Sequence, residues 1–123
     1  MSIGILIIDD SPEIRNMLKS WLERDDRLSV CGEASDGAEG IEKALQLKPD
    51  VIVLDLSMPG MNGLEAATVL RTAMPEVPIV MLTLYPDSEL ARKALDAGVS
   101  AILSKMEAMS VLCDEVGRLA GIN

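Results

Sequence analysis

Four short apolar runs in this chain each lead into a polar side chain of a chemically reactive type. Runs of roughly four apolar residues between turn residues are typical of strands that are buried on both faces of a parallel sheet. Open α/β sheets bind their ligands at the carboxyl ends of such strands. We therefore expect three carboxylates, a hydroxyl and an ammonium group to meet at one edge of the molecule. The runs are Ile5-Leu6-Ile7-Ile8 before Asp9 and Asp10, Val51-Ile52-Val53-Leu54 before Asp55, Ile79-Val80-Met81-Leu82 before Thr83, and Ala101-Ile102-Leu103-Ser104 before Lys105.

Segments with helical periodicity alternate with these runs and with a shorter strand that we predict over Leu28–Cys31. The first helix is expected to begin at Ser11-Pro12, with Ser as the N-cap and Pro at the first helical position. Apolar residues spaced three and four apart are expected to face the sheet. They are Ile14, Met17, Leu18, Trp21 and Leu22; Ile41, Ala44 and Leu45; Leu64, Ala67 and Leu70; Leu90, Ala94 and Leu95; and Met109, Leu112, Val116 and Leu119.

The alternation of strands with helices predicts βαβ units and a parallel sheet. Right-handed crossovers then place helices on both faces of the sheet, which gives a doubly wound α/β fold of the (βα)5 type. A chain of 123 residues fits a single domain. We therefore expect residues 1–123 to form one domain.

Composition excludes several classes of function. The net charge of −9 argues against a nucleic-acid-binding surface, because binding to phosphates requires an excess of cations. The absence of histidine excludes a histidine-based zinc site, a serine–histidine triad and a histidine phosphocarrier. No apolar run approaches the ~20 residues of a membrane span, and the chain enters a strand pattern without a signal peptide. We expect a cytoplasmic protein.

The adjacent acidic residues Asp9 and Asp10 are candidate metal ligands. Carboxylates also stabilise the positive end of a helix dipole, but Ser11 already serves as the cap of the first helix. Repulsion among Asp9, Asp10 and Asp55 would raise at least one pKa unless a cation lies between them. Mg²⁺ prefers oxygen ligands and commonly binds one or two carboxylates together with phosphate oxygens. The pattern therefore favours a Mg²⁺ site.

Asp55 is the best candidate for a nucleophile. A carboxylate can attack phosphorus and form an aspartyl phosphate. A lone Asp after a strand would usually be an ordinary turn residue, but Thr83 and Lys105 occupy equivalent strand ends. Phosphoryl transfer depends on positioning and on neutralising the phosphoryl oxygens, and a hydroxyl, an ammonium and Mg²⁺ can provide both. The joint placement of these residues predicts a phosphoryl-transfer site.

The whole chain resembles a response-regulator receiver domain of a bacterial two-component system. The resemblance implies a flavodoxin-like fold with five parallel strands in the order 2-1-3-4-5. It also implies that a sensor histidine kinase, or another phosphotransfer protein, phosphorylates Asp55. The matching segments are Ile7-Ile8-Asp9-Asp10-Ser11-Pro12, Val53-Leu54-Asp55-Leu56-Ser57-Met58-Pro59-Gly60-Met61-Asn62-Gly63, Met81-Leu82-Thr83 and Ala97-Gly98-Val99-Ser100-Ala101-Ile102-Leu103-Ser104-Lys105.

The resemblance also implies roles for the remaining site residues. Asp10, Asp55 and the main-chain carbonyl of Ser57 would bind Mg²⁺, and Asp9 would contribute mainly through water. Lys105 would pair with the phosphate, and Thr83 would move to hydrogen-bond it. The surface formed by the fourth helix, the fifth strand and the last helix would then change, which could promote homodimerisation or control an output. The central loop resembles that of regulators with a helix-turn-helix output domain, so the expected output is transcriptional.

Two positions depart from the family's usual pattern. Ile102 stands three residues before the lysine, where most receivers have Tyr or Phe, so the usual coupling between the threonine and an aromatic rotamer is in doubt. Met106 follows the lysine, where many receivers have a proline in a cis bond. A cis bond before a non-proline residue costs about 2.5–4 kcal/mol. The Lys105 side chain is therefore expected to be oriented by other means.

Other functions remain open at this stage. An aspartyl phosphatase of the haloacid-dehalogenase type uses a nucleophilic Asp followed two residues later by an acidic residue, and here Ser57 occupies that second position. For flavodoxin-like nucleotide binding, the sequence lacks a phosphate-binding loop after the first strand and the aromatic residues that would contact the nucleotide. A receiver-like interaction module that is never phosphorylated is disfavoured by the complete set of site residues. The leading interpretation is a phosphorylated switch that turns over no metabolite.

Overall fold

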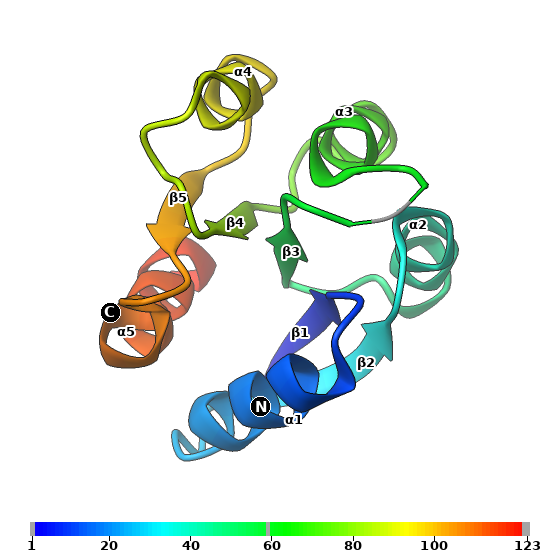
Figure 1. The fold of residues 1–123 in the computed structure, drawn as a ribbon. Helices are drawn as coiled ribbons and strands as arrows, with labels where there is room; N and C mark the ends of the chain where they lie inside the picture. The colour runs from blue at the N-terminus through cyan, green and yellow to red at the C-terminus, as the bar shows by residue number, and fades with distance from the viewer. Residues whose placement is uncertain (1, 59, 122–123) are drawn as a thin grey trace.

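Five strands alternate with five helices, as the sequence predicted (Figure 1). The computed structural model describes residues 2–58 and 60–121, apart from the side chains of residues 108–110. The elements are β1 (Ile3–Ile8), α1 (Pro12–Leu22), β2 (Leu28–Ala34), α2 (Gly37–Leu47), β3 (Val51–Asp55), α3 (Gly63–Ala73), β4 (Ile79–Thr83), α4 (Glu89–Asp96), β5 (Ala101–Ser104) and α5 (Ala108–Ala120).

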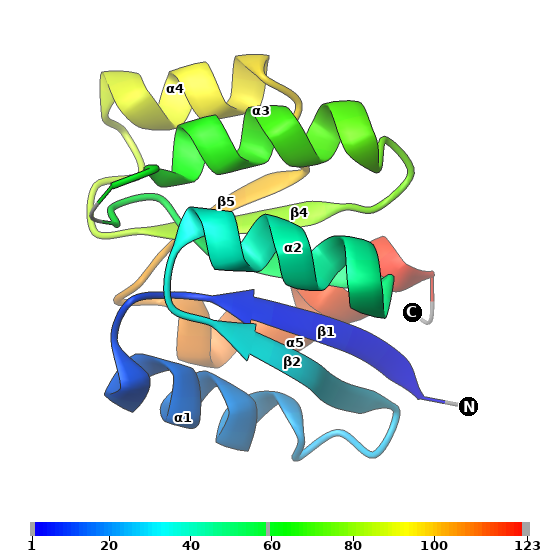
Figure 2. The same cartoon turned by 90° about the vertical axis from the view of Figure 1, so that its right-hand side faces the viewer.

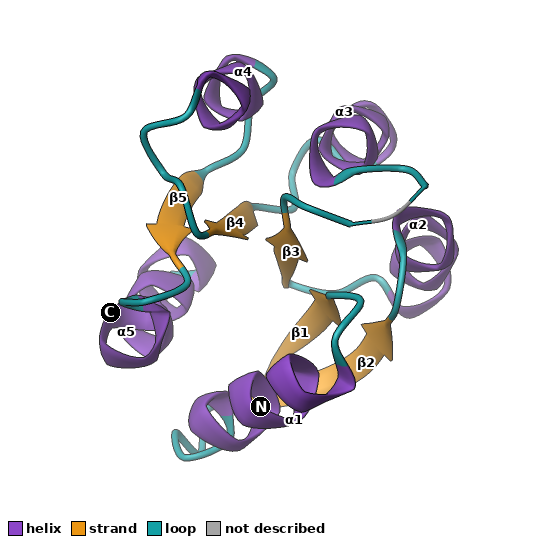
Figure 3. Ribbon diagram, viewed as in Figure 1, coloured by secondary structure: helices purple, strands orange, loops and turns teal. Residues whose placement is uncertain are grey.

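The strands form one parallel sheet in the order β2-β1-β3-β4-β5, which confirms the predicted doubly wound, flavodoxin-like fold. Helices α1 and α5 cover one face of the sheet, and α2, α3 and α4 cover the other (Figures 2 and 3). No helix in the described part of the chain is long and apolar enough to cross a membrane.

Each strand contributes side chains to two separate cores, because successive residues of a strand point to opposite faces. In β1, Ile5 and Ile7 pack with α1 and α5, whereas Leu6 and Ile8 pack with α2, α3 and α4. All four side chains are fully buried. This two-sided burial explains why the strands read as continuous apolar runs in the sequence.

Strand β2 corrects one prediction. It does not end at Cys31 as predicted but continues to Ala34, with seven residues, and it contains a bulge. Ile5 pairs with Val30, but the next residue, Leu6, pairs with Gly32, so Cys31 is an extra residue in β2. An extra residue shifts the alternation of side chains between the two faces. The sequence pattern of β2 was therefore difficult to recognise beyond Cys31.

Three residues predicted to face the sheet are instead substantially exposed. Met17, Leu45 and Leu95 have exposed fractions of 42%, 51% and 50%. In α2 and α4 the smaller Ala44 and Ala94 are fully buried against the sheet, and these helices turn Leu45 and Leu95 toward the outer surface. The predicted inward position of Met109 lies outside the side chains that the structure describes.

Candidate functional site

The polar residues that end the strands lie together at the carboxyl edge of the sheet. Asp9 follows β1, Asp55 and Thr83 are the last residues of β3 and β4, and Lys105 follows β5. Because β1, β3, β4 and β5 are successive neighbours in the sheet, the strand ends converge as predicted. Asp9, Asp55 and Thr83 are exposed by only 1%, 2% and 4%, whereas Asp10 is exposed.

Lys105 bridges two of the buried carboxylates. Its Nζ lies 3.2 Å from Oδ1 of Asp55 and 3.4 Å from Oδ2 of Asp9. The main-chain N–H of Lys105 also donates to the Thr83 carbonyl at 2.8 Å, which continues the pairing of β4 with β5. The lysine therefore reaches the site although Met106, exposed by 82%, replaces the proline usual in the family.

The three carboxylates are close enough to share a cation. One oxygen from each of Asp9, Asp10 and Asp55 lies within 4.8 Å of the others. Oδ2 of Asp9 is buried without a hydrogen bond, and its contact with Lys105 at 3.4 Å is an ion pair only. A buried acceptor in this state is costly. Hard oxygen donors with an unsatisfied member fit the preferences of Mg²⁺.

The surroundings of Asp55 raise its pKa from 3.8 to about 6. Burial is the main cause, and the neighbouring charge of Asp9 adds to it, while Lys105 acts in the opposite direction. Burial alone would lower the pKa of Lys105, but the negative charges of Asp55 and Asp9 outweigh it and raise that pKa above its ordinary value. Near neutral pH the site therefore contains an ionised nucleophile beside a charged ammonium.

Thr83 is buried at the end of β4, but its hydroxyl is used locally. Its Oγ1 accepts a hydrogen bond from the N–H of Tyr85 at 3.1 Å. Among the hydrogen bonds of the described residues, none joins Thr83 to the Asp55 carboxylate. This contact uses an acceptor lone pair of the hydroxyl and leaves its own O–H donor for another acceptor.

The loop after β3 supports Asp55 in two ways. The main-chain N–H of Ser57 donates to Oδ1 of Asp55 at 3.1 Å. A Cβ at Gly63, the first residue of α3, would collide with the carbonyl oxygen of Asp55 and with Leu56, so glycine allows α3 to begin against the nucleophile's backbone. The predicted role of the Ser57 carbonyl as a metal ligand stays a prediction, and Pro59 of the same loop lies outside the described residues.

One contact at the site was not anticipated from the sequence. The Arg15 guanidinium donates to the main-chain carbonyl of Asp9 at 2.6 Å and also pairs with Glu33 at 3.3 Å. An arginine in the first turn of a helix ordinarily indicates a solvated charge. Only the bulge in β2, which the sequence pattern does not reveal, brings Glu33 to this side of the sheet.

Comparisons with known proteins agree with this geometry. The profile of a family described as the response regulator receiver domain matches residues 5–117. The response regulator protein VraR of Staphylococcus epidermidis is 36% identical over 116 residues, which cover 94% of this chain and 56% of the relative. The chain thus spans only about half the length of this relative.

Solved structures show the same fold over almost the whole chain. The response regulator domain of Thermotoga maritima CheB has a TM-score of 0.92 and 28% identity, covering 100% of this chain and 99% of that one. A two-component response regulator of the LuxR family from Aurantimonas sp. SI85-9A1 has a TM-score of 0.91 and 28% identity, covering 98% of this chain and 86% of that one.

Proposed function

Because the chain belongs to the family of response regulator receiver domains, we propose that Asp55 accepts a phosphoryl group from a phosphohistidine of a sensor histidine kinase. The observation that carries the proposal is the contact of a buried, ionisable Asp55 with the Lys105 ammonium at 3.2 Å. Residues 1–123 then act as one receiver domain, a regulator rather than an enzyme that turns over a metabolite.

In the transfer step, Oδ2 of Asp55 attacks phosphorus, and the new O–P bond forms as the N–P bond of the phosphohistidine breaks. The electron pair of the broken bond returns to the imidazole nitrogen of the kinase. Oδ1 is already bound by Lys105 and by the Ser57 N–H, so these two contacts hold the carboxylate in place during attack. Catalysis in such a step comes from positioning and from charge neutralisation.

Asp9, Asp10, Asp55 and the main-chain carbonyl of Ser57 are the groups that would hold Mg²⁺, with Asp9 acting mainly through water. When bound, the ion supplies positive charge to the phosphoryl oxygens and lowers the repulsion among the carboxylates. The Lys105 ammonium, now shared between Asp9 and Asp55, would turn to the phosphoryl oxygens once the cation balances the carboxylates.

The phosphoryl group would change the surface formed by α4, β5 and α5. It adds up to about two negative charges, and the Thr83 hydroxyl would donate its O–H to a phosphoryl oxygen. Because Ile102 has no aromatic ring, the change would travel through the main chain after Thr83 and shift an existing equilibrium. The same surface would then control a homodimer or an output domain.

The proposed output is transcriptional. The relative VraR is a response regulator nearly twice as long as the matched segment, and one structural relative is described as a LuxR-family response regulator. Both are consistent with a receiver that regulates a further domain or partner. Slow hydrolysis of the aspartyl phosphate by water would return the domain to its resting state.

The test is phosphorylation of the purified domain by acetyl phosphate with Mg²⁺, followed by intact-protein mass spectrometry. We expect one phosphoryl adduct on the wild type, none on Asp55→Asn, and an unchanged adduct on the control Asp96→Asn, which changes an exposed carboxylate at the end of α4. An equal adduct on Asp55→Asn would overturn the assignment. A wild type that binds Mg²⁺ but never forms the adduct would favour a receiver-like interaction module.

A further inference from the structure

Three of the four polar atoms of Asp9 form hydrogen bonds with described residues. Its N–H donates to the Ala34 carbonyl of β2 at 3.0 Å, and its Oδ1 accepts from the Ser11 N–H at 2.9 Å. Its carbonyl accepts from Nη1 of Arg15 at 2.6 Å. Only Oδ2 has no hydrogen bond, and it faces Lys105. The orientation of Asp9 is therefore determined by contacts outside the carboxylate cluster itself.

The bond from Arg15 also acts on Asp10. The carbonyl of Asp9 belongs to the peptide plane that joins the two acidic residues, and that plane is rigid. The Asp10 side chain is exposed, and no described side chain holds its carboxylate, so its direction depends on the main chain. A hydrogen bond that holds the Asp9 carbonyl therefore also holds the main-chain nitrogen and Cα of Asp10, from which its side chain extends.

Arg15 is itself held by Glu33, and the β2 bulge makes this possible. Glu33 pairs with Ile7, which faces α1 and α5. If Cys31 were a regular strand residue and not a bulge, the alternation that buries Leu28 and Val30 on that face would turn Glu33 toward α2 instead. Bulges often re-aim a side chain next to a functional site. Here the bulge places a carboxylate beside the Arg15 guanidinium at 3.3 Å.

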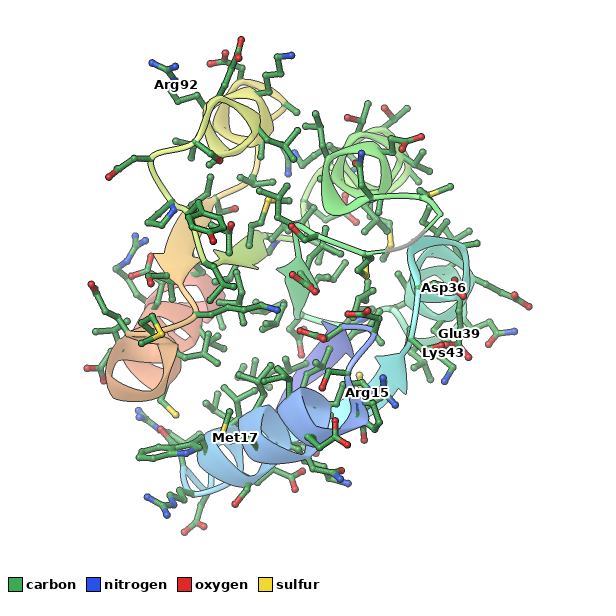
Figure 4. All side chains as sticks on the ribbon, in the orientation of Figure 1. Arg15, Met17, Asp36, Glu39, Lys43 and Arg92 are labelled. Carbon is green, nitrogen blue, oxygen red and sulfur yellow. The ribbon has the colours of Figure 1, made fainter. Side chains whose placement is uncertain are left out.

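On the face of the sheet that α2 covers, a lysine holds the main chain of Glu33. Lys43 of α2 donates to the main-chain carbonyl of Glu33 and pairs with Glu39 at 3.7 Å. Arg15, Lys43 and Glu39 can be followed in Figure 4, where Arg15 lies between α1 and the end of β2 and the other two lie on α2. The end of the edge strand is thus bound from α1 and from α2.

We propose that Arg15 is a positioning residue for the cation site, because it binds the Asp9 carbonyl and the Glu33 carboxylate at the same time. This inference rests on the proposed function, since it assumes that Asp9 and Asp10 serve a cation. The Arg15 side chain is only 18% exposed, so its two contacts compete little with water. Partners that orient metal ligands typically contribute 10–100-fold in affinity, and the preference of Mg²⁺ for near-ideal geometry makes it sensitive to such positioning.

The test measures Mg²⁺ affinity by calorimetry in unphosphorylated Arg15→Met, Arg15→Lys and Glu33→Ala. Arg15→Met should weaken binding about tenfold, and Arg15→Lys should recover part of the loss, because its ammonium keeps the charge but lacks the two separate nitrogens that bind Glu33 and the Asp9 carbonyl. The control Lys19→Gln removes one charge from the same helix one turn further from the site. Loss of that charge alone should leave Mg²⁺ binding unchanged or slightly tighter.

Two further measurements separate positioning from folding and from charge. In the metal-free protein, the amide of Ser11, which donates to Oδ1 of Asp9, should exchange faster in Arg15→Met than in the wild type, while amides in β3 stay protected. Glu33→Ala should weaken Mg²⁺ binding in the wild type but have no further effect in Arg15→Met, because Glu33 acts through Arg15. If Arg15→Met unfolds, Glu33→Ala in the otherwise wild-type protein still tests the inference, because it leaves the arginine in place.

The inference is overturned if Arg15→Met and Glu33→Ala lower thermal stability without changing Mg²⁺ affinity, or if Arg15→Met tightens binding as Lys19→Gln does. These outcomes are independent of the phosphorylation assay. A wild type that binds Mg²⁺ but forms no adduct would remove the proposed function and leave the role of Arg15 to be decided by the affinities.

Discussion

The two sides of the site are built differently. On the β1–β2 side, the N–H of Asp9 is bound to Ala34 of β2, its carbonyl to Arg15 of α1 and its Oδ1 to the nearby Ser11 N–H. On the β4–β5 side, the one hydrogen bond of the Thr83 hydroxyl to another described residue comes from the nearby Tyr85 N–H. Leu84 and Tyr85 are exposed by 54% and 72%, and α4 has only eight residues. The acidic side is preorganised, whereas the side that must respond to phosphate can change at lower cost.

Lys105 connects these two sides, and its replacement should have the largest effect. Lys105→Met would leave Asp9 and Asp55 buried without their shared ammonium. Breaking a fully buried ion pair costs about 3–5 kcal/mol. Because the Lys105 side chain is 23% exposed, we expect the free energy of unfolding to fall by about 2 kcal/mol. Urea unfolding in metal-free buffer at pH 7.5 measures this.

The matched control is Lys93→Met on the exposed surface of α4, which should change stability by less than about 0.5 kcal/mol. Mg²⁺ should recover much of the loss in Lys105→Met, because a second cation replaces the ammonium. An unchanged unfolding free energy would show that the lysine does not balance the two carboxylates.

On the preorganised side, replacing the single exposed residue Asp10 should abolish cation binding. We expect Asp10→Ala to remove the thermal stabilisation that Mg²⁺ gives the wild type, which is about 1.4 kcal/mol at ten times the dissociation constant. Metal-free stability should hardly change, because the Asp10 side chain is exposed. Thermal melts with and without Mg²⁺ measure both quantities, and a mutant that keeps the full shift would place the ion elsewhere.

The pH dependence of stability should report the raised pKa of Asp55, which burial causes first and the charge of Asp9 second. With a folded pKa of about 6 against 3.8 unfolded, the folded state binds more protons between these values. The unfolding free energy of the metal-free wild type therefore falls as pH rises through this window. Asp55→Asn does not titrate, so it should become more stable relative to the wild type between pH 4 and 7. A constant difference across denaturation curves at these pH values would contradict the raised pKa.

The responsive side should give a modest change in stability and the clearest change in signalling. Thr83→Ala removes one hydrogen-bond acceptor, which contributes about 1 kcal/mol, but it should uncouple phosphorylation from any change in dimerisation or partner binding. Amide exchange with and without a phosphoryl mimic measures the response. Changes confined to the Asp55 pocket in the wild type, with none between Thr83 and Gly117, would show that this side does not switch.

Ile102→Tyr is the paired variant for that experiment. Ile102 packs against the core on the α2–α4 side of the sheet. Its aliphatic side chain offers no hydrogen bond to the Asp55 carboxylate. Phosphorylation of Ile102→Tyr should therefore remain close to that of the wild type. A large loss would mean that position 102 acts on the chemistry as well as on the readout.

Much of the site could be predicted because it follows from strand ends. Asp9, Asp55, Thr83 and Lys105 each follow an apolar run, and the geometry of a parallel sheet brings such ends to one edge. The predictions of individual helix faces were less accurate. Met17, Leu45 and Leu95 fit the helical spacing, but the smaller alanines of α2 and α4 pack closest to the sheet and leave those leucines outside.

The sequence by itself determined the alternation of elements, the parallel sheet and the set of reactive groups at its edge, because burial on two faces and helical periodicity are visible in the order of residues. Only the tertiary structure decided that Lys105 is shared between Asp9 and Asp55, and that Arg15 binds the Asp9 carbonyl. Both depend on distances between elements far apart in the chain. The contact between Arg15 and Glu33 depends further on one extra residue in β2, which reverses the direction of a side chain without leaving a pattern in the sequence.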